Sequence, residues 1–396
     1  MQPNPSTFSA SLNFPMHALR GLERVPVGPR EPRALRPRRV GGRREPRFGL
    51  APVFRIGLCV PMRGSAGIWG PSCLASAQLA EAELNQACGI SRRPCELQLI
   101  DASAESPDVE STLTELVEGG QVDALVGMCI SSVRQRIVGA VGGTVPFIYT
   151  CLYEGGASTP GLFAIGETSL RQLRPSIAWL SARHKTQRWM LVGNDYIWPR
   201  VSHRIAQTCI TESGGEVVAQ AFVRFGLEDY SQVLDQLRKS RADAVLISMV
   251  GQDAVDFNRA FARAGLSTQV LRLSCAIEEN QLLAIGAENT ENLHVALGYF
   301  SSLDTDANQS FKQRYLSRFG ERAPTLNSIG QSLYEGMHFL ATLVEDDAQA
   351  SHPSGRQAPL PYASARTATY VGGGTNHAPM YLARADGHSF RVLARF

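Results

Sequence analysis

The chain has 396 residues, 44% of them hydrophobic, which is enough to bury one large core or two smaller ones. No stretch approaches the roughly 18 consecutive apolar residues of a membrane-spanning helix. Residues 1–53 hold ten Arg, three Glu and no Lys or Asp, so the rest of the chain is mildly acidic and offers no basic surface for direct binding of nucleic acid.

Residues 1–53 are rich in Arg and Pro and show no apolar periodicity, which predicts a disordered tail. The tail lacks the apolar run of a secretory signal, so the protein as encoded is expected in the cytoplasm. The alternative is a misassigned start site and a periplasmic protein. Eight Cys without a C-x-x-C pair favour a reducing compartment. Neither Cys nor His shows zinc spacing, so no metal or cofactor is expected.

Short apolar runs alternate with longer amphipathic stretches from residue 54 onward. The runs lie at 54–60, 95–101, 123–128 and 145–150, and then at 188–193, 216–223, 243–250, 269–274 and 292–298. Helices are expected between them at 71–88, 106–120, 131–141, 200–213, 230–240 and 253–264. This alternation predicts βαβ units and parallel sheets, and nine strands favour two lobes of four to six strands each.

The pattern changes after residue 300. Residues 306–319 and 328–345 read as two successive helices, and 346–365 are loop-like in composition. The sequences "APMYLARA" and "SFRVLARF" alternate in polarity on either side of Asp386–Gly387, which predicts a C-terminal β-hairpin.

The sequence contains no catalytic motif. A P-loop, a dinucleotide-binding G-x-G-x-x-G and a G-x-S-x-G nucleophile turn are all absent, so the protein is not expected to be an enzyme. Open α/β sheets bind ligands at the carboxyl ends of their strands. The loops expected there carry hydroxyl, thiol and aromatic side chains, which suit a small polar molecule: Ser131, Tyr149, Thr150, Tyr196, Trp198, Ser274 and Cys275.

Five segments in this order resemble a known family. They are "LVG" followed by Ser131 and Arg134, Y-x-x-x-Y-E-G from Tyr149 to Gly155, "GNDYIWPR" at 193–200, "ADAVLISMVG" and "YFSSLDT" at 299–305. Together they resemble the type I periplasmic-binding fold, in the branch of the amide sensor of the aliphatic amidase operon and the urea or short-chain amide receptors of ABC transporters. The resemblance covers residues 54–396.

The resemblance implies an α/β fold of two lobes, each a mostly parallel sheet flanked by helices, that close on a ligand. The first lobe would comprise 54–172 and 301–348, and the second 173–300 and 366–396, with 349–365 as a loop. Position by position, it implies ligand contacts from Ser131, Tyr149, Thr150, Cys151, Leu152, Tyr196, Trp198, Ser274 and Cys275. Cys151 and Leu152 stand where the amide sensors have Pro and Thr, and Trp198 where they have Tyr, which leaves a larger or more apolar ligand open.

The expected function is binding without catalysis, of an amide, urea or similar molecule, by a sensor that signals to a regulatory protein. The alternative is the substrate-binding subunit of an ABC importer for urea, amides or branched-chain amino acids, with the permease as partner; a homo-oligomer is also possible. A neutral ligand is expected, because an α-amino acid needs a buried carboxylate for its ammonium group. Asp253 and Glu278 are the candidates for that carboxylate.

Overall fold

The computed structural model describes residues 52–156, 159–349, 360–372 and 375–396. The predicted tail lies outside these ranges except for its last two residues, and so do residues 350–359 of the predicted loop. No helix in the described ranges is both long and apolar enough to cross a membrane.

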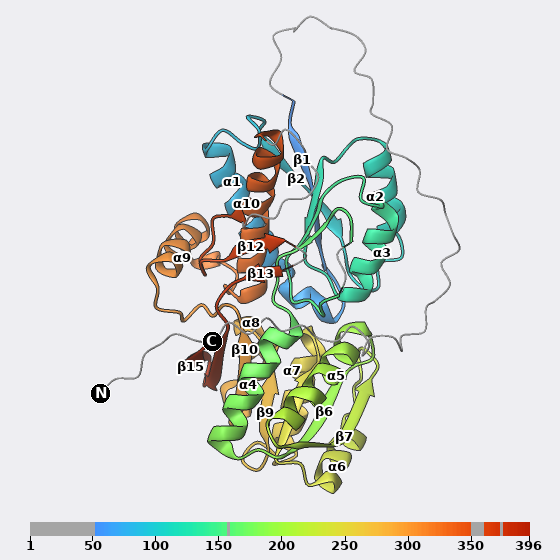
Figure 1. The fold of residues 1–396 in the computed structure, drawn as a ribbon, viewed down its shortest axis with the longest axis vertical. Coiled ribbons are helices and arrows are strands. Elements are labelled where there is room, and N and C mark those ends of the chain that lie inside the picture. The colour runs from blue at the N-terminus through green and yellow to red at the C-terminus, as the bar shows by residue number, and fades with distance from the viewer. Residues whose placement is uncertain (1–51, 157–158, 350–359, 373–374) are drawn as a thin grey trace, which may run out of the picture. The chain divides into compact units, whose positions relative to one another are not determined.

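The first sheet has five parallel strands in the order β2–β1–β3–β4–β5. Their apolar side chains are covered on both faces, and β1 buries Ile56, Leu58 and Val60 completely. Each such residue contributes about 1.5–3 kcal/mol of burial free energy. Figure 1 shows α1 and α10 on one face and α2 and α3 on the other. The strands are β1 (Phe54–Val60), β2 (Cys95–Asp101), β3 (Ala124–Gly127), β4 (Phe147–Tyr149) and β5 (Leu162–Ala164), and the helices are α1 (Gly70–Gln86), α2 (Val109–Glu118), α3 (Ser131–Val141) and α10 (Ser328–Gln349).

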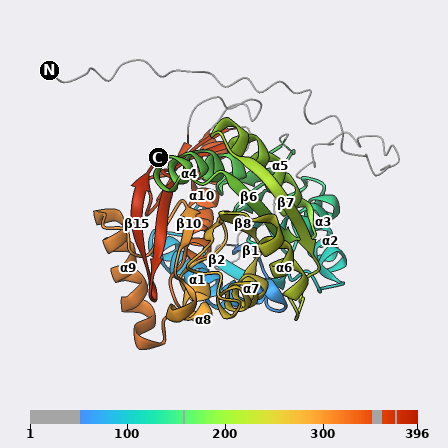
Figure 2. The ribbon, with the colours of Figure 1, turned by 90° about the horizontal axis from the view of Figure 1, so that it is seen from below.

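The second sheet has seven strands in the order β15–β14–β10–β9–β8–β6–β7. Strands β10, β9, β8, β6 and β7 run parallel to one another. Helices α4 and α5 pack together, as do α7 and α8, and Figure 2 shows these pairs on opposite faces. The strands are β6 (Arg188–Asn194), β7 (Glu216–Val223), β8 (Ala244–Ser248), β9 (Leu271–Ser274) and β10 (Leu293–Leu297), and the helices are α4 (Ser169–His184), α5 (Ile197–Glu212), α6 (Ser231–Ser240), α7 (Gly251–Arg263) and α8 (Glu279–Ile285).

The predicted C-terminal hairpin is confirmed. Strands β14 (Tyr381–Asp386) and β15 (Ser389–Arg395) pair antiparallel, and Gly387 takes the positive φ of 63° that the turn requires. The hairpin joins β10 at the edge of the second sheet (Figure 2). A separate small sheet contains β11 (Leu360–Pro361), β12 (Thr369–Gly372) and β13 (Thr375–His377). Its Tyr370 packs against Phe339 of α10, with ring centroids 5.0 Å apart.

Three stretches of chain connect the two sheets. The first, 165–168, runs from β5 to α4, and the second, 298–305, runs from β10 to α9 (Asp306–Phe319). Helix α9 packs against α1, so the chain has returned to the first sheet there. The third, 378–380, leads from β13 to the hairpin. The residues around these connections therefore decide how one sheet is held on the other.

The structure corrects several of the predicted elements. Helix α4, strand β5 and helix α8 were not anticipated. Pro175 lies inside α4 and three Arg interrupt its apolar pattern, while β5 and α8 are short. Tertiary packing stabilises such segments when local propensity is weak. Helix α5 begins at Ile197 rather than at 200, so Trp198 belongs to its first turn and not to a loop.

Candidate ligand-binding site

The parallel strands of both sheets follow the same order in space. The strand first in sequence lies between the second and the third, as β1 does between β2 and β3 and β6 between β7 and β8. The chain leaves β1 toward one face of the first sheet and leaves β3 toward the other face, and β6 and β8 do the same in the second sheet. The loops that follow these strands therefore diverge and leave a crevice between them. Ligands of open α/β sheets bind in such crevices.

A cavity lies where these loops meet; about 320 Å³ of space there, open solvent included, is not filled by protein atoms. Residues from both sheets contribute to it. From the first sheet and its helices come Trp69, Met128, Cys129, Ile130, Ser131, Tyr149, Cys151, Leu152 and Ile329, and from the second come Tyr196, Trp198 and Val250. The structure thus brings together six of the nine predicted site residues.

Two indole rings form much of the wall, one from each sheet. The Trp69 side chain follows β1 and that of Trp198 follows β6, and both are buried. Tyr196 packs beside Trp198, with ring centroids 6.4 Å apart, and on Phe225 at 5.3 Å. These rings give the cavity an aromatic, apolar lining that suits a flat or aliphatic ligand body.

Two of the lining residues carry buried hydrogen-bond donors. The Nε1–H groups of Trp69 and Trp198 are buried and have no hydrogen-bond partner among the described residues. A buried donor without a partner costs about 1–3 kcal/mol, which a ligand acceptor would recover.

Four helices also begin at this cavity. Their N-cap residues are Trp69 for α1, Ile130 for α3, Tyr196 for α5 and Val250 for α7, and all four line it. None of the four caps its helix with a side-chain hydrogen bond. Helix α1 continues directly from the 3-10 helix Ser65–Trp69, whose Gly67 carbonyl accepts the Gly70 N–H, so its N-terminus is not free. The N-terminal N–H groups and positive dipole ends of α3, α5 and α7 favour an oxygen acceptor or an anionic group.

The thiols at the cavity are neutral. Burial raises the pKa of Cys151 to about 12 and that of Cys129 well above its usual value. The Cys151 Sγ–H donates to the Cys129 carbonyl at 3.3 Å, and the Tyr149 hydroxyl donates to the same oxygen at 2.8 Å. These groups shape the wall as small, weakly polar surfaces and lack the thiolate that nucleophilic chemistry requires.

A buried ion pair lies behind the Ser131 side of the cavity. The Ser131 hydroxyl donates to Glu154 Oε2 at 2.6 Å, and the Arg134 guanidinium binds both oxygens of the same carboxylate. Burial alone would lower the pKa of Arg134, but the hydrogen bond to Glu154 more than offsets this and the pKa is raised. The guanidinium also lies over the rings of Tyr149 and Tyr153, about 5 Å from each centroid. This network holds the side chains of Ser131, Tyr149 and Tyr153 in place, and the Ser131 hydroxyl proton is donated within it.

Three predicted site residues do not line the cavity. Thr150 is fully buried and its hydroxyl bonds to the Gly127 carbonyl at 3.4 Å. The Ser274 hydroxyl donates to the Ile247 carbonyl at 3.1 Å, and the adjacent Cys275 is a buried thiol. All three side chains serve the sheet that carries them.

Sequence reasoning missed six lining residues: Trp69, Met128, Cys129, Ile130, Val250 and Ile329. Trp69 carried a usable signal, because it follows the first strand just as Trp198 follows the sixth. Ile329 had none, since it reaches the cavity from the start of α10, 79 residues or more beyond every other lining residue in the chain.

Asp253 and Glu278 do not line the cavity, although both were candidates for an ammonium partner. Asp253 Oδ1 accepts the Ser65 hydroxyl at 2.5 Å, and Glu278 Oε2 accepts the Ile329 N–H at 3.0 Å. Each carboxylate therefore belongs to the second sheet and binds a residue associated with the first. These two contacts hold the sheets together around the cavity, and we call this arrangement closed.

The described lining residues carry no charged side chain. Across the described part of the chain, no group of three or more His, Cys, Asp or Glu is placed to hold a metal ion. The cavity therefore presents aromatic walls, neutral thiols and a surplus of N–H donors, and a ligand's ammonium group would find no carboxylate among these residues.

Two α/β lobes with a cavity between their strand ends define a two-lobed ligand-binding protein. The chain belongs to the periplasmic binding protein family, whose model matches residues 53–389. The predicted two-lobed fold of type I periplasmic-binding proteins is thereby confirmed, and the resemblance holds at the level of the family.

Curated and solved relatives agree with this assignment. A Leu/Ile/Val-binding protein homolog from Brucella melitensis is 24% identical over 305 residues, or 74% of this chain and 76% of that protein. Similar in fold is an R. palustris ABC-transporter solute-binding protein in complex with 4-hydroxybenzoate, with a TM-score of 0.77, 14% identity, and coverage of 87% of this chain and 97% of that one. A branched-chain amino acid transporter substrate-binding protein from Streptococcus pneumoniae in complex with isoleucine has a TM-score of 0.71, 18% identity, and coverage of 87% and 99%.

Proposed function

We propose that the protein is the substrate-binding subunit of an ABC importer. The curated relative is named as a binding protein, one solved relative belongs to an ABC transporter, and the other is the substrate-binding protein of a branched-chain amino acid transporter. This is the alternative reading of the sequence, and these relatives support it better than they support an amide or urea sensor. They are also named as binding proteins, which agrees with a function without catalysis.

We further propose that the ligand is a small, flat or aliphatic molecule with a carboxylate or amide oxygen and no ammonium group. The observation that carries this proposal is the set of donors at the cavity: two buried indole N–H groups without partners among the described residues and the uncapped N-termini of α3, α5 and α7, with no carboxylate among the described lining residues. A carboxylate or amide oxygen would accept from these donors. Solved relatives hold both 4-hydroxybenzoate and isoleucine, so ancestry alone leaves the choice open.

In this role the protein would work on the outer side of the cytoplasmic membrane and deliver its ligand to a permease. The eight cysteines weigh little against this location. Seven of them are buried, and buried neutral thiols are inert in an oxidising compartment as well.

The ligand proposal is tested by isothermal titration of the whole chain with benzoate, 4-hydroxybenzoate, acetamide, urea, isoleucine and leucine. We expect the protein to bind one or more of the aromatic carboxylates or amides and to bind neither isoleucine nor leucine. Tight binding of isoleucine or leucine would overturn the ligand class. Deleting the gene in its source organism then separates the two roles: loss of uptake of the ligand supports the carrier, whereas intact uptake with altered expression of neighbouring genes supports a sensor.

A further inference from the structure

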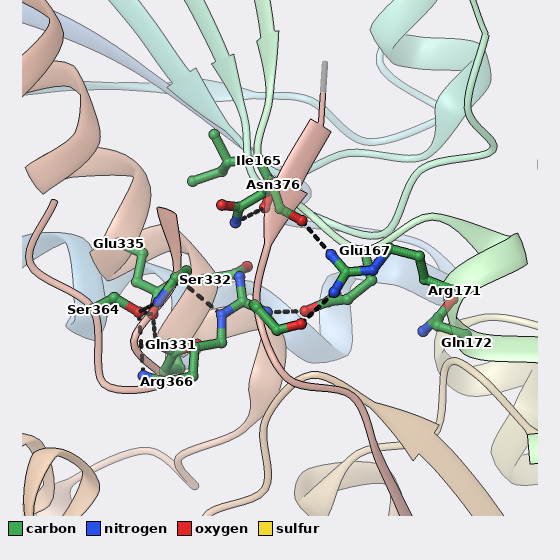
Figure 3. Close-up of polar contacts among 12 residues, drawn as sticks. Ile165, Glu167, Arg171, Gln172, Gln331, Ser332, Glu335, Ser364, Arg366 and Asn376 are labelled. Atoms are coloured by element: carbon green, nitrogen blue, oxygen red, sulfur yellow. Dashed lines mark hydrogen bonds and ion pairs between the residues drawn. The ribbon is translucent and has the colours of Figure 1, made fainter. Parts of the chain in front are cut away.

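One buried guanidinium, that of Arg366, lies at the first connection between the sheets (Figure 3). Arg366 lies between β11 and β12, and its side chain is completely buried. One end of the guanidinium pairs with Glu167 in the first connection. The other end pairs with Glu335 of α10, with Nε 2.9 Å from Oε2. A single cation therefore joins the first connection to a helix of the first sheet.

The second connection passes directly over this ion pair at Gly298. A Cβ at that position would lie 2.0 Å from Glu167 Oε1 and 2.6 Å from Arg366 Nη1, so a side chain there would displace the pair. The backbone of the second connection is therefore in contact with the same charges.

The third connection is bound to the first a few residues away. Arg171, at the start of α4, donates to the carbonyls of Asn376 and Ala378, and Asn376 Nδ2 donates to the Ile165 carbonyl at 2.6 Å (Figure 3). Any rotation of one sheet on the other bends these three connections, because no other described stretch of backbone links the two sheets.

The cluster of Glu167, Glu335 and Arg366 has one positive charge for two carboxyl groups. With all three ionised it is a buried net negative charge, which is costly in a water-free interior. Gln331 and Ser364 donate to Glu335 Oε1 and offset part of this cost. A proton on Glu335 removes the excess negative charge, and Arg366 then forms an ion pair with Glu167 alone.

We propose that this cluster is a proton-dependent lock on the three connections, which holds the sheets closed when Glu335 is protonated and lets them open when Glu335 is ionised. The consequence for ligand release rests on the proposed function, whereas the lock itself concerns the ligand-free protein as well.

The surroundings of Glu335 allow the proton to be exchanged near neutral pH. Burial raises the pKa of Glu335 to about 7. Burial also lowers the pKa of Arg366, to about 10, so the guanidinium remains charged. The other titratable groups that face Glu335 are the phenols of Tyr299 and Tyr362, and burial raises the pKa of both, so they remain neutral.

Opening changes the protonation equilibrium of Glu335, because in the proposed lock it moves the connections apart and admits water. Water stabilises the ionised carboxylate, so the pKa of Glu335 is lower in the open form than in the closed form. By linkage, the form with the higher pKa binds the proton more tightly and is favoured at low pH. The closed fraction should therefore fall as the pH rises through about 7.

The lock is tested by small-angle X-ray scattering of the ligand-free whole chain between pH 5.5 and 8.5. We expect the radius of gyration of the wild type to increase with pH, with a midpoint near neutrality. Glu335→Gln, which is nearly isosteric with the protonated acid, should keep the low-pH value throughout. Glu167→Gln should shift the midpoint to lower pH, because Glu335 then has Arg366 to itself.

Two further variants make the test specific. Glu83→Gln removes a partly buried carboxylate that pairs with Arg314 within the first lobe, and it should titrate like the wild type. Glu279 is buried, has a pKa raised by burial to about 7, and accepts the Ser301 N–H of the second connection, so Glu279→Gln controls for a second titrating group.

A radius that does not change with pH in the wild type, or a pH dependence that survives in Glu335→Gln, would overturn the lock. Loss of the pH dependence in Glu279→Gln instead would also overturn it. Circular dichroism verifies that each variant is folded. Because the scattering needs no ligand, failure of the titrations with candidate ligands would reject the ligand class and leave this result standing.

Discussion

The indole of Trp198 offers the sharpest test of how the cavity recognises its ligand. Its Nε1–H is buried at the cavity without a partner among the described residues. Trp198→Phe removes this donor and keeps an aromatic ring in place. A hydrogen bond to a neutral acceptor contributes about 0.5–1.5 kcal/mol and one to a charged acceptor about 1.5–3 kcal/mol. With 1.4 kcal/mol per factor of ten, affinity should fall by roughly 2- to 12-fold for an amide and by roughly 12- to 150-fold for a carboxylate.

The chain provides a matched control in Trp189. This residue lies in β6, is fully buried, and also has an indole N–H without a partner among the described residues, but it does not line the cavity. Trp189→Phe should lower the free energy of unfolding by about as much as Trp198→Phe does, but it should leave ligand affinity unchanged. Calorimetric titration of both variants with 4-hydroxybenzoate and with acetamide, together with thermal unfolding, separates the two effects. Wild-type affinity in Trp198→Phe would refute the assignment of this indole as a ligand donor.

Two further predictions concern buried carboxylates. In the wild type the Asn194 side-chain amide and the Gly226 N–H donate to the Asp253 carboxylate. Asp253→Asn puts an amide group there instead, so it should weaken closure and lower the affinity for every ligand by a similar factor, worth about 1–2 kcal/mol. A loss of affinity confined to amino acids would show instead that Asp253 binds their ammonium group. For Glu335, a folded-state pKa of about 7 against 4.5 means a stabilising contribution that is complete below pH 4.5 and lost as the pH rises through 7. Denaturant unfolding should therefore show the wild type losing about 3 kcal/mol relative to Glu335→Gln between pH 4 and pH 8, and parallel curves would contradict the raised pKa.

The position of the cavity was partly predictable from the sequence, because several predicted strands end next to it. Residues that line the cavity lie at or within a few residues after the ends of β3, β4 and β6, and the period of the apolar pattern fixed where those strands end. Ser274 and Cys275 follow the same rule at the end of β9, yet they do not line it. Strand β4 holds the equivalent place in the first sheet and its loop does line the cavity, so strand order alone does not decide the difference. It depends on how the two sheets pack on each other, which is not written in any local stretch of sequence.

The charges also show what local patterns leave open. Asp253 and Glu278 each follow a strand, as an ammonium partner would, but both bind backbone or hydroxyl groups from the other sheet. Arg366 gave no signal at all, because its partners Glu167 and Glu335 are 199 and 31 residues away. Their meeting depends on how three connections cross between the sheets.

The sequence by itself determined the α/β class, most of the parallel strands, the C-terminal hairpin and the aromatic character of the site. These follow from short-range periodicity and turn chemistry, which act over a few residues. Only the tertiary structure decided which loops face the cavity, that Trp69 and Ile329 join Trp198 there, and that one guanidinium holds the connections. Those outcomes depend on contacts between segments far apart in the chain, and their free energy exists only once both sheets have formed and packed.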